Sequence, residues 1–128
     1  MARASSNQPT EVELQILRIL WDQGPSIARQ IHDSLQTFKQ TTYSTTVKML
    51  SVMLGKGLVK RDESASPQVY RAAVTREIAG KRLVKDLVEK VYDGAAATLA
   101  LHALRAGKSS AEELAEIRRL LDEMEGRS

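Results

Sequence analysis

A short hairpin pattern follows directly after a run of helical patterns, and it constrains the fold more than any other feature of the sequence. Residues 58–61 have high β propensity, residues 62–67 are a polar turn that ends in proline, and residues 68–74 return as a second strand. Three helical patterns precede this hairpin. This order is typical of a winged helix-turn-helix domain. We predict a mainly α (α+β) fold in which the hairpin is the wing.

Local signals bound the first two helical patterns. Thr10 and Glu13 have the spacing of a capping box at the start of the first helix. Asp22-Gln23-Gly24-Pro25 supplies turn chemistry at its end. Ser26 is predicted to cap the second helix, in which apolar residues recur every four positions. The first helix is broadly apolar and is therefore predicted to belong to the core.

The third helical pattern lies in a basic stretch without acidic residues. Residues 34–61 contain five Lys or Arg and no Asp or Glu. Residues 46–53 repeat with the period of one buried helix face, hydroxyl side chains precede them, and glycines follow. Taken alone, this pattern also fits an ordinary solvated helix. Its place between a second helix and a hairpin predicts a recognition helix for the major groove of DNA.

Nine residues of this region are predicted to contact double-stranded DNA. Hydroxyls at a helix N-terminus can bond to phosphates or bases, and threonine methyls suit thymine methyls. Lys and Arg at the helix end and on the hairpin can reach phosphates beside the groove. Tyr43 has a competing role as a packing residue beneath the helix. The predicted contacts are Thr42, Tyr43, Ser44, Thr45, Lys48, Lys56, Lys60, Arg61 and Arg71.

Charge divides the chain into two halves. Residues 1–74 hold 9 Lys or Arg against 6 Asp or Glu, whereas residues 75–128 hold 10 of each. The net charge of +3 therefore lies in the half with the predicted winged helix, as expected for a partner that is a polyanion. We predict a flexible N-terminus over residues 1–8, a winged-helix DNA-binding domain over residues 9–74, and a helical dimerisation domain over residues 75–128.

The C-terminal half is patterned as three helices with apolar stripes. Three short helices beside a wing cannot easily enclose all of these stripes, so a second copy of the chain is predicted to cover them. The alternative is that the helices pack back on the winged helix. The predicted dimer contacts are Val84, Leu87, Val88, Val91, Leu99, Leu114, Ile117, Leu121 and Met124.

Composition argues against several other functions. The chain has no cysteine, which excludes disulfides, thiolate metal sites and cysteine nucleophiles. Its two histidines are 70 positions apart without clustered carboxylates, and no Ser/His/Asp set is present. We therefore expect no metal, no cofactor and no enzymatic activity. No run approaches the roughly 20 apolar residues of a membrane span, and the N-terminus lacks a signal-peptide core, so we expect a cytoplasmic protein.

Several runs resemble the penicillinase and methicillin-resistance repressors, the BlaI/MecI family. The runs are Tyr43–Leu50, Gly55–Arg61 and Val69–Val74, together with the opening Glu11–Leu14 and Ile19–Trp21. The sequence Lys-Gly-Leu-Val-Lys-Arg alone is common among winged-helix regulators. Its combination with the recognition helix, the wing and a short all-helical tail is specific, and the resemblance extends from about Pro9 to the end of the chain.

The resemblance implies a homodimeric repressor that holds a promoter off by binding a dyad-symmetric operator with half-sites of the TACA/TGTA type. Several such repressors are released when a membrane sensor triggers proteolysis at an Asn-Phe bond. The nearest position here is His102-Ala103, so that bond is not retained. Val52 stands where the family often carries arginine, and the cysteine cluster of the copper-responsive branch is absent.

Two other functions stay open at this point. A ligand-responsive regulator of the MarR or PadR kind usually brackets its winged helix with long dimer helices, whereas here the first helix begins almost at once and the tail is short. A winged helix can also be a protein-interaction module without DNA binding. Val47, Val52 and Leu54 would supply apolar side chains for such a role.

Overall fold

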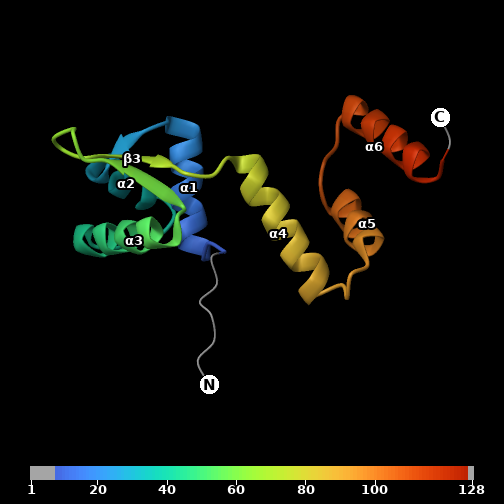
Figure 1. Ribbon diagram of the computed structural model, residues 1–128, viewed down its shortest axis with the longest axis horizontal. Helices are drawn as coiled ribbons and strands as arrows, with labels where there is room; N and C mark the ends of the chain where they lie inside the picture. Colours follow the sequence, from blue (N-terminus) through green and yellow to red (C-terminus); the bar gives the residue numbers. More distant parts are fainter. Residues whose placement is uncertain (1–7, 127–128) are drawn as a thin grey trace, which may run out of the picture. The chain divides into compact units, whose positions relative to one another are not determined.

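The computed structural model describes residues 8–126, and the chain divides into two compact units, one ending at Val84 and one beginning at Lys85. Residues 1–7 of the predicted flexible N-terminus lie outside the described residues. The elements in chain order are α1 (Glu11–Gln23), β1 (Ser26–Ile27), α2 (Ala28–Leu35), α3 (Tyr43–Lys56), β2 (Val59–Asp62), β3 (Val69–Ala72), α4 (Arg76–Lys90), α5 (Ala96–Ala106) and α6 (Ala111–Met124) (Figure 1).

Helix α1 begins and ends where the sequence predicts. The Thr10 side chain accepts a hydrogen bond from the Glu13 N–H at 3.3 Å, and Glu13 Oε1 accepts one from the Thr10 N–H at 2.9 Å. These reciprocal bonds satisfy two backbone donors that a helix start otherwise leaves unpaired. Gly24 follows the helix with a φ of 79°, a conformation that glycine adopts without strain. The predicted capping box and turn are thus confirmed.

The sheet has one strand more than the sequence predicts. The sheet has the order β1-β3-β2 with antiparallel pairs, and Tyr70 of β3 lies opposite Ser26 of β1 and Arg61 of β2. The prediction that Ser26 caps α2 is wrong. Its backbone pairs with β3 and its hydroxyl donates to the Gly24 carbonyl, while Ile27 is the residue before the helix. A two-residue strand is too short to leave a period-2 pattern in the sequence.

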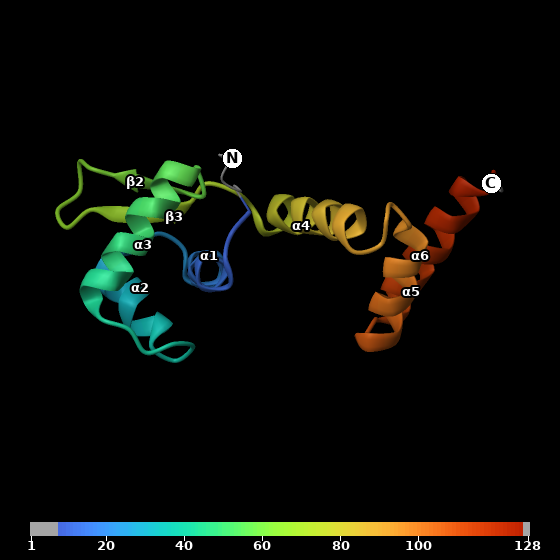
Figure 2. The same cartoon turned by 90° about the horizontal axis from the view of Figure 1, so that it is seen from below.

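One aliphatic core holds the winged helix together. It consists of Ile16, Leu17, Leu20, Ile31, Leu35, Leu50, Met53, Leu58, Val59 and Tyr70, which come from all three helices and from both wing strands. The two views show α3 beside the β2–β3 hairpin, with α2 and α1 behind it (Figures 1 and 2). Because the buried face of α3 is fixed against this core, its opposite face is presented to solvent. The predicted fold class, a winged helix followed by helices, is confirmed.

The start of α4 is tied to α1. Trp21 Nε1 donates to the Val74 carbonyl at 2.9 Å, and Arg76 forms an ion pair with Asp22 at 2.7 Å. The Thr75 hydroxyl accepts from the Ile78 N–H at 3.1 Å and so satisfies a backbone donor at the start of the helix. These contacts anchor the first part of α4 to the winged helix.

The second unit has little core of its own. None of the described residues from 85 to 126 is buried. Helix α6 begins with a capping box in which Ser110 and Glu113 exchange two hydrogen bonds of 3.0 Å each. The Ser110 N–H, which donates to the Glu113 carboxylate, and then the Ser110 hydroxyl hold the pKa of that carboxyl below its usual range, because they favour the ionised form. Among the described helices, none has the length and apolar character needed to cross a membrane.

Candidate nucleic-acid interface

Specific capping interactions define both ends of helix α3. Thr42 precedes the helix and its hydroxyl accepts from the Thr45 N–H at 3.2 Å. Gly57 ends it in the left-handed conformation, with a φ of 76°, and Leu58 N–H bonds back to the Met53 carbonyl at 3.0 Å. The helix therefore has a defined start from which its hydroxyl side chains project.

Those hydroxyls form one exposed cluster at the N-terminus of α3. Thr42 Oγ1 lies 3.2 Å from Ser44 Oγ and 2.9 Å from Thr45 Oγ1. All three residues are exposed. Because Thr42 caps the helix, the hydroxyls of Ser44 and Thr45 are the ones with capacity to bond a further acceptor or donor. A cluster of this kind can contact phosphate oxygens or the edges of bases.

A buried polar link sets the crossing of α2 and α3. Thr46 is fully buried, and its hydroxyl lies 2.8 Å from His32 Nδ1. Gln36 Nε2 approaches the same ring nitrogen at 3.1 Å. No sequence pattern indicates this role, because His32 meets Thr46 only when the two helices are packed together. The link fixes how α3 is rotated against α2, and therefore which of its side chains face solvent.

Tyr43 packs against a neighbouring ring and also stays partly exposed. Its ring meets the His32 ring edge-on at a centroid distance of 5.5 Å and an interplanar angle of 89°. The residue nevertheless keeps 38% of its surface exposed. The guanidinium of Arg29, which the sequence analysis did not single out, lies 4.0 Å from the centroid of the same ring. Arg29 stands at the start of α2, outside the basic stretch and 14 positions before Tyr43, so only the folded chain brings the two side chains together.

The five predicted cations fall into two groups. Lys48, Lys60 and Arg71 are exposed and form no ion pair among residues 8–126. Lys56 forms an ion pair of 2.8 Å with Glu13, whose side chain is 5% exposed. Arg61 hydrogen-bonds to Tyr70, which raises the pKa of its guanidinium, and it lies 3.6 Å from Glu63. The first group is available to phosphates, whereas the second already has partners within the protein.

The turn of the wing carries an acidic residue of its own. Asp62 Oδ1 accepts from the Ser64 hydroxyl at 2.6 Å and from the Ser64 N–H at 3.0 Å. These bonds, the hydroxyl first, hold the pKa of Asp62 below its usual range. The wing turn is thus ordered by a carboxylate that stays ionised, which places one negative charge beside Lys60 and Arg61.

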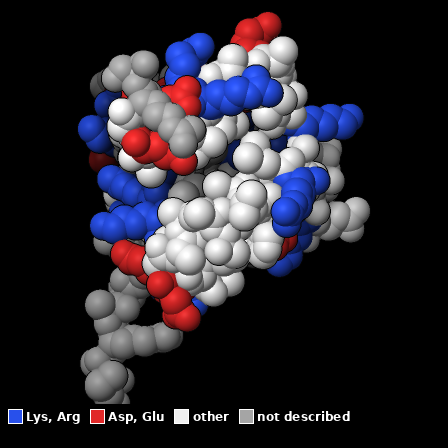
Figure 3. Space-filling view, turned by 90° about the vertical axis from the view of Figure 1, so that its right-hand side faces the viewer, with Lys and Arg blue, Asp and Glu red and all other residues white. Residues whose placement is uncertain are grey.

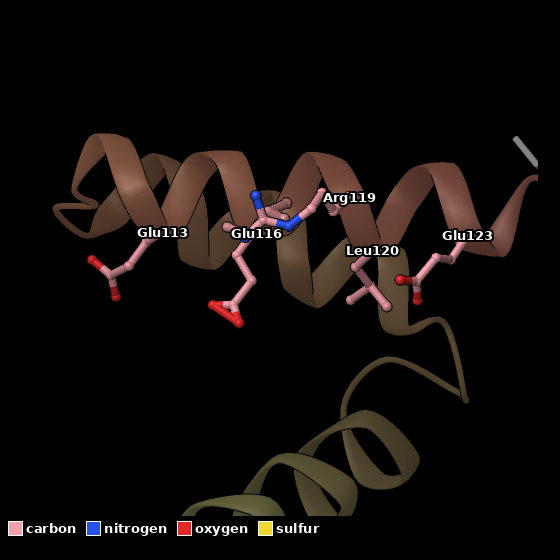
Figure 4. Close-up of a pocket in the computed structure, with 6 residues that line it drawn as sticks. Glu113, Glu116, Arg119, Leu120 and Glu123 are labelled. Atoms are coloured by element: carbon pink, nitrogen blue, oxygen red, sulfur yellow. The ribbon is translucent and has the colours of Figure 1, made fainter. Parts of the chain in front are cut away.

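The predicted dimer contacts lie on accessible surface. Each of them is exposed or half-buried. The side of the molecule on which α5 and α6 lie in Figure 1 shows a broad area without charged side chains, bordered by charged ones (Figure 3). Glu113, Glu116, Leu120 and Glu123 project together from one side of α6, and the hollow beside them is lined by α6 alone (Figure 4). A surface formed by one helix does not enclose a ligand.

The position nearest the family's cleavage site lies on α5. His102 and Ala103 are exposed on α5, and His102 Nδ1 lies 3.1 Å from the Tyr92 hydroxyl. Within the part of the chain that the structure describes, no three His, Cys, Asp or Glu side chains are grouped as metal ligands would be.

Helix α3 turns a hydroxyl-rich face to solvent, packs on a helix-turn-helix core and is flanked by a β-hairpin. This arrangement defines a winged-helix DNA-binding protein. Comparison with known proteins narrows this class. The family model described as penicillinase repressor matches residues 9–123. The chain therefore belongs to the penicillinase repressor family, and it is a transcriptional repressor. It is 20% identical over 122 residues to the penicillinase repressor of Staphylococcus aureus, and the aligned region covers 93% of this chain and 97% of that protein.

Proposed function

We propose that the protein represses transcription as a homodimer bound to a dyad-symmetric operator, with TACA/TGTA-type half-sites as the resemblance implies. The observation that carries the proposal is the exposed hydroxyl cluster at the N-terminus of α3, which stands beside Lys48 and is flanked by the wing. Occupancy of the operator is sufficient for repression, because it excludes polymerase. In this proposal the protein acts in the cytoplasm, where its operator lies.

Within the proposal, groove contacts and backbone contacts are made by different side chains. Ser44, Thr45 and Lys48 contact bases or phosphates in the major groove. Lys60 and Arg71 contact the backbone beside that groove, which positions the helix without reading sequence. Contacts from Lys56 and Arg61 are predicted to contribute less, because both side chains already bind Glu13 or Tyr70.

The proposed dimer forms through the C-terminal helices. Leu87, Val91, Leu121 and Met124 are 41%, 62%, 51% and 75% exposed, a large apolar surface for a unit without buried residues. Burial of such surface is worth about 25 cal/mol per Å² and favours association. A two-fold axis then places two α3 helices on half-sites one or more helical turns of DNA apart, a spacing of roughly 34–36 Å for one turn.

The resemblance implies release by proteolysis under the control of a membrane sensor, and the position nearest the family's Asn-Phe bond is His102-Ala103, where that bond is not retained. Both residues lie within α5, and cleavage between them would divide a helix of the proposed dimer unit. Loss of the dimer would then lower operator affinity, since each protomer would hold only one half-site.

The test is binding to the intergenic DNA upstream of the chain's own gene, measured by gel shift at two salt concentrations. We expect two protomers to bind saturably and with strong salt dependence. The variant Thr45→Ala/Lys48→Ala should lose this binding, whereas Thr98→Ala/Lys108→Ala removes the same residue types from the second unit and should keep it. Wild-type protein that prefers no sequence over random DNA at low salt would refute the proposal and favour a protein-interaction module.

The dimer is tested separately by sedimentation velocity. Leu121→Gln should shift the protein toward monomer, and Glu123→Gln serves as the control because Glu123 lies on the charged side of α6 (Figure 4). A wild-type protein that sediments as a monomer at all accessible concentrations would refute the dimer without refuting DNA binding.

A further inference from the structure

A hollow of about 310 Å³ lies between the recognition helix and the wing. Three parts of the first unit line it: the start of α2, the exposed face of α3 and the wing. Its residues include Ile27, Arg29, Tyr43, Val47, Pro67 and Gln68. The lining contains one cationic side chain, Arg29, and no acidic one. An open hollow with this single charge fits an anionic strand that crosses the surface.

Arg29 is held in place by an aromatic stack. Its guanidinium lies 4.0 Å from the Tyr43 ring centroid, and the ring is in turn set edge-on against His32, which is fixed through Thr46. A stacked guanidinium keeps its N–H edge free, and that edge matches the geometry of a phosphate. Arg29 is exposed and forms no ion pair with any residue from 8 to 126.

We propose that Arg29 binds a phosphate of the operator backbone and that Tyr43 is its positioning residue. The ligand is the sugar-phosphate strand that passes from the major groove occupied by α3 toward the wing. This inference rests on the proposed function and adds a contact from α2, outside the basic stretch. It also gives Tyr43 a specific task, since its ring serves as a platform for the cation rather than as a reader of bases.

The test is the salt dependence of DNA affinity, measured by fluorescence anisotropy with operator and random-sequence duplexes. Each neutralised phosphate contributes about 0.9 to the slope of log K against log salt. Arg29→Gln should therefore lower the slope by about 1 per protomer, and the change in affinity between roughly 50 and 200 mM salt should shrink by about 3-fold to 4-fold for each protomer bound. Both duplexes should be affected by the same factor, because a phosphate contact carries no sequence information.

Variants of Tyr43 separate positioning from direct contact. Tyr43→Phe keeps the ring and should bind as the wild type does. Tyr43→Leu should weaken binding in the wild-type background and add little to Arg29→Gln, because the two residues act as one unit in a double-mutant cycle. Arg18→Gln removes the same charge from an exposed position of α1, which does not line the hollow, and is the matched control. Thermal melts verify that each variant is folded.

The outcomes distinguish this inference from the function on which it rests. If the wild type binds DNA and folded Arg29→Gln binds with the same salt slope, the role of Arg29 is refuted but the proposed function is not. Additive losses in Tyr43→Leu and Arg29→Gln refute the positioning role of Tyr43. Absence of salt-dependent binding by the wild type refutes the proposed function, and this inference with it.

Discussion

Replacing Lys56 with methionine should destabilise the winged helix rather than weaken DNA binding. Lys56 Nζ lies 2.8 Å from Glu13 Oε1, the same oxygen that accepts the Thr10 N–H at 2.9 Å. The Glu13 side chain is 5% exposed and that of Lys56 is 20% exposed. The substitution leaves a buried carboxylate without its cation, at the point where the end of α3 is joined to the start of α1.

The magnitude follows from the burial of the pair. Exposed ion pairs contribute about 0–1 kcal/mol, whereas removing one partner of a buried pair costs about 3–5 kcal/mol. Glu13 is buried but Lys56 reaches solvent, so we expect a loss of about 2 kcal/mol in the free energy of unfolding. For a chain of this size that loss lowers the melting temperature by about 8 °C.

The assay is thermal unfolding followed by far-UV circular dichroism at one fixed protomer concentration, because an associating protein melts at a concentration-dependent temperature. Glu13→Gln/Lys56→Met should recover much of the loss, since no buried charge remains. Lys48→Met, on the exposed face of the same helix, should melt as the wild type does and bind DNA with a smaller salt slope. If Lys56→Met were as stable as the wild type but bound DNA with a smaller salt dependence, Lys56 would be a DNA contact instead of a stabilising partner of Glu13.

Three further predictions concern local contacts. Trp21→Phe removes the 2.9 Å bond to the Val74 carbonyl and should cost about 1 kcal/mol in urea denaturation, a loss that would be absent if water replaces the donor. Gly57→Ala forces a side chain into a φ of 76° and should cost about 1 kcal/mol, whereas Gly55→Ala, within α3, should not destabilise. The lowered pKa of Glu113 stabilises α6 at neutral pH, and this contribution is lost as pH falls through that pKa. The difference in helicity between wild type and Glu113→Gln should therefore vanish in acid, and a constant difference would contradict the assignment.

Features that depend on neighbours along the chain can be predicted from the amino-acid sequence alone. Helix starts at Thr10, Thr42 and Ser110 follow from hydroxyls whose hydrogen bonds close within three residues. The buried face of α3 follows from its 3.6-residue period, and the wing follows from two short β-prone runs around a polar turn. These signals, with the family resemblance, were sufficient for the fold class and for the hydroxyl cluster of the site.

Which charged and aromatic side chains the interface can use depends on contacts between elements that are distant in the sequence. Lys56 and Glu13 are 43 positions apart, so their ion pair cannot be predicted from the sequence, in which Lys56 looks like an unpaired cation. The pairing of β1 with β3, the link from His32 to Thr46 and the stack of Arg29 on Tyr43 likewise join separate elements. The physical reason is that periodicity and capping act over one or two helical turns, whereas pairing and stacking depend on which side chains packing brings within a few ångströms of one another.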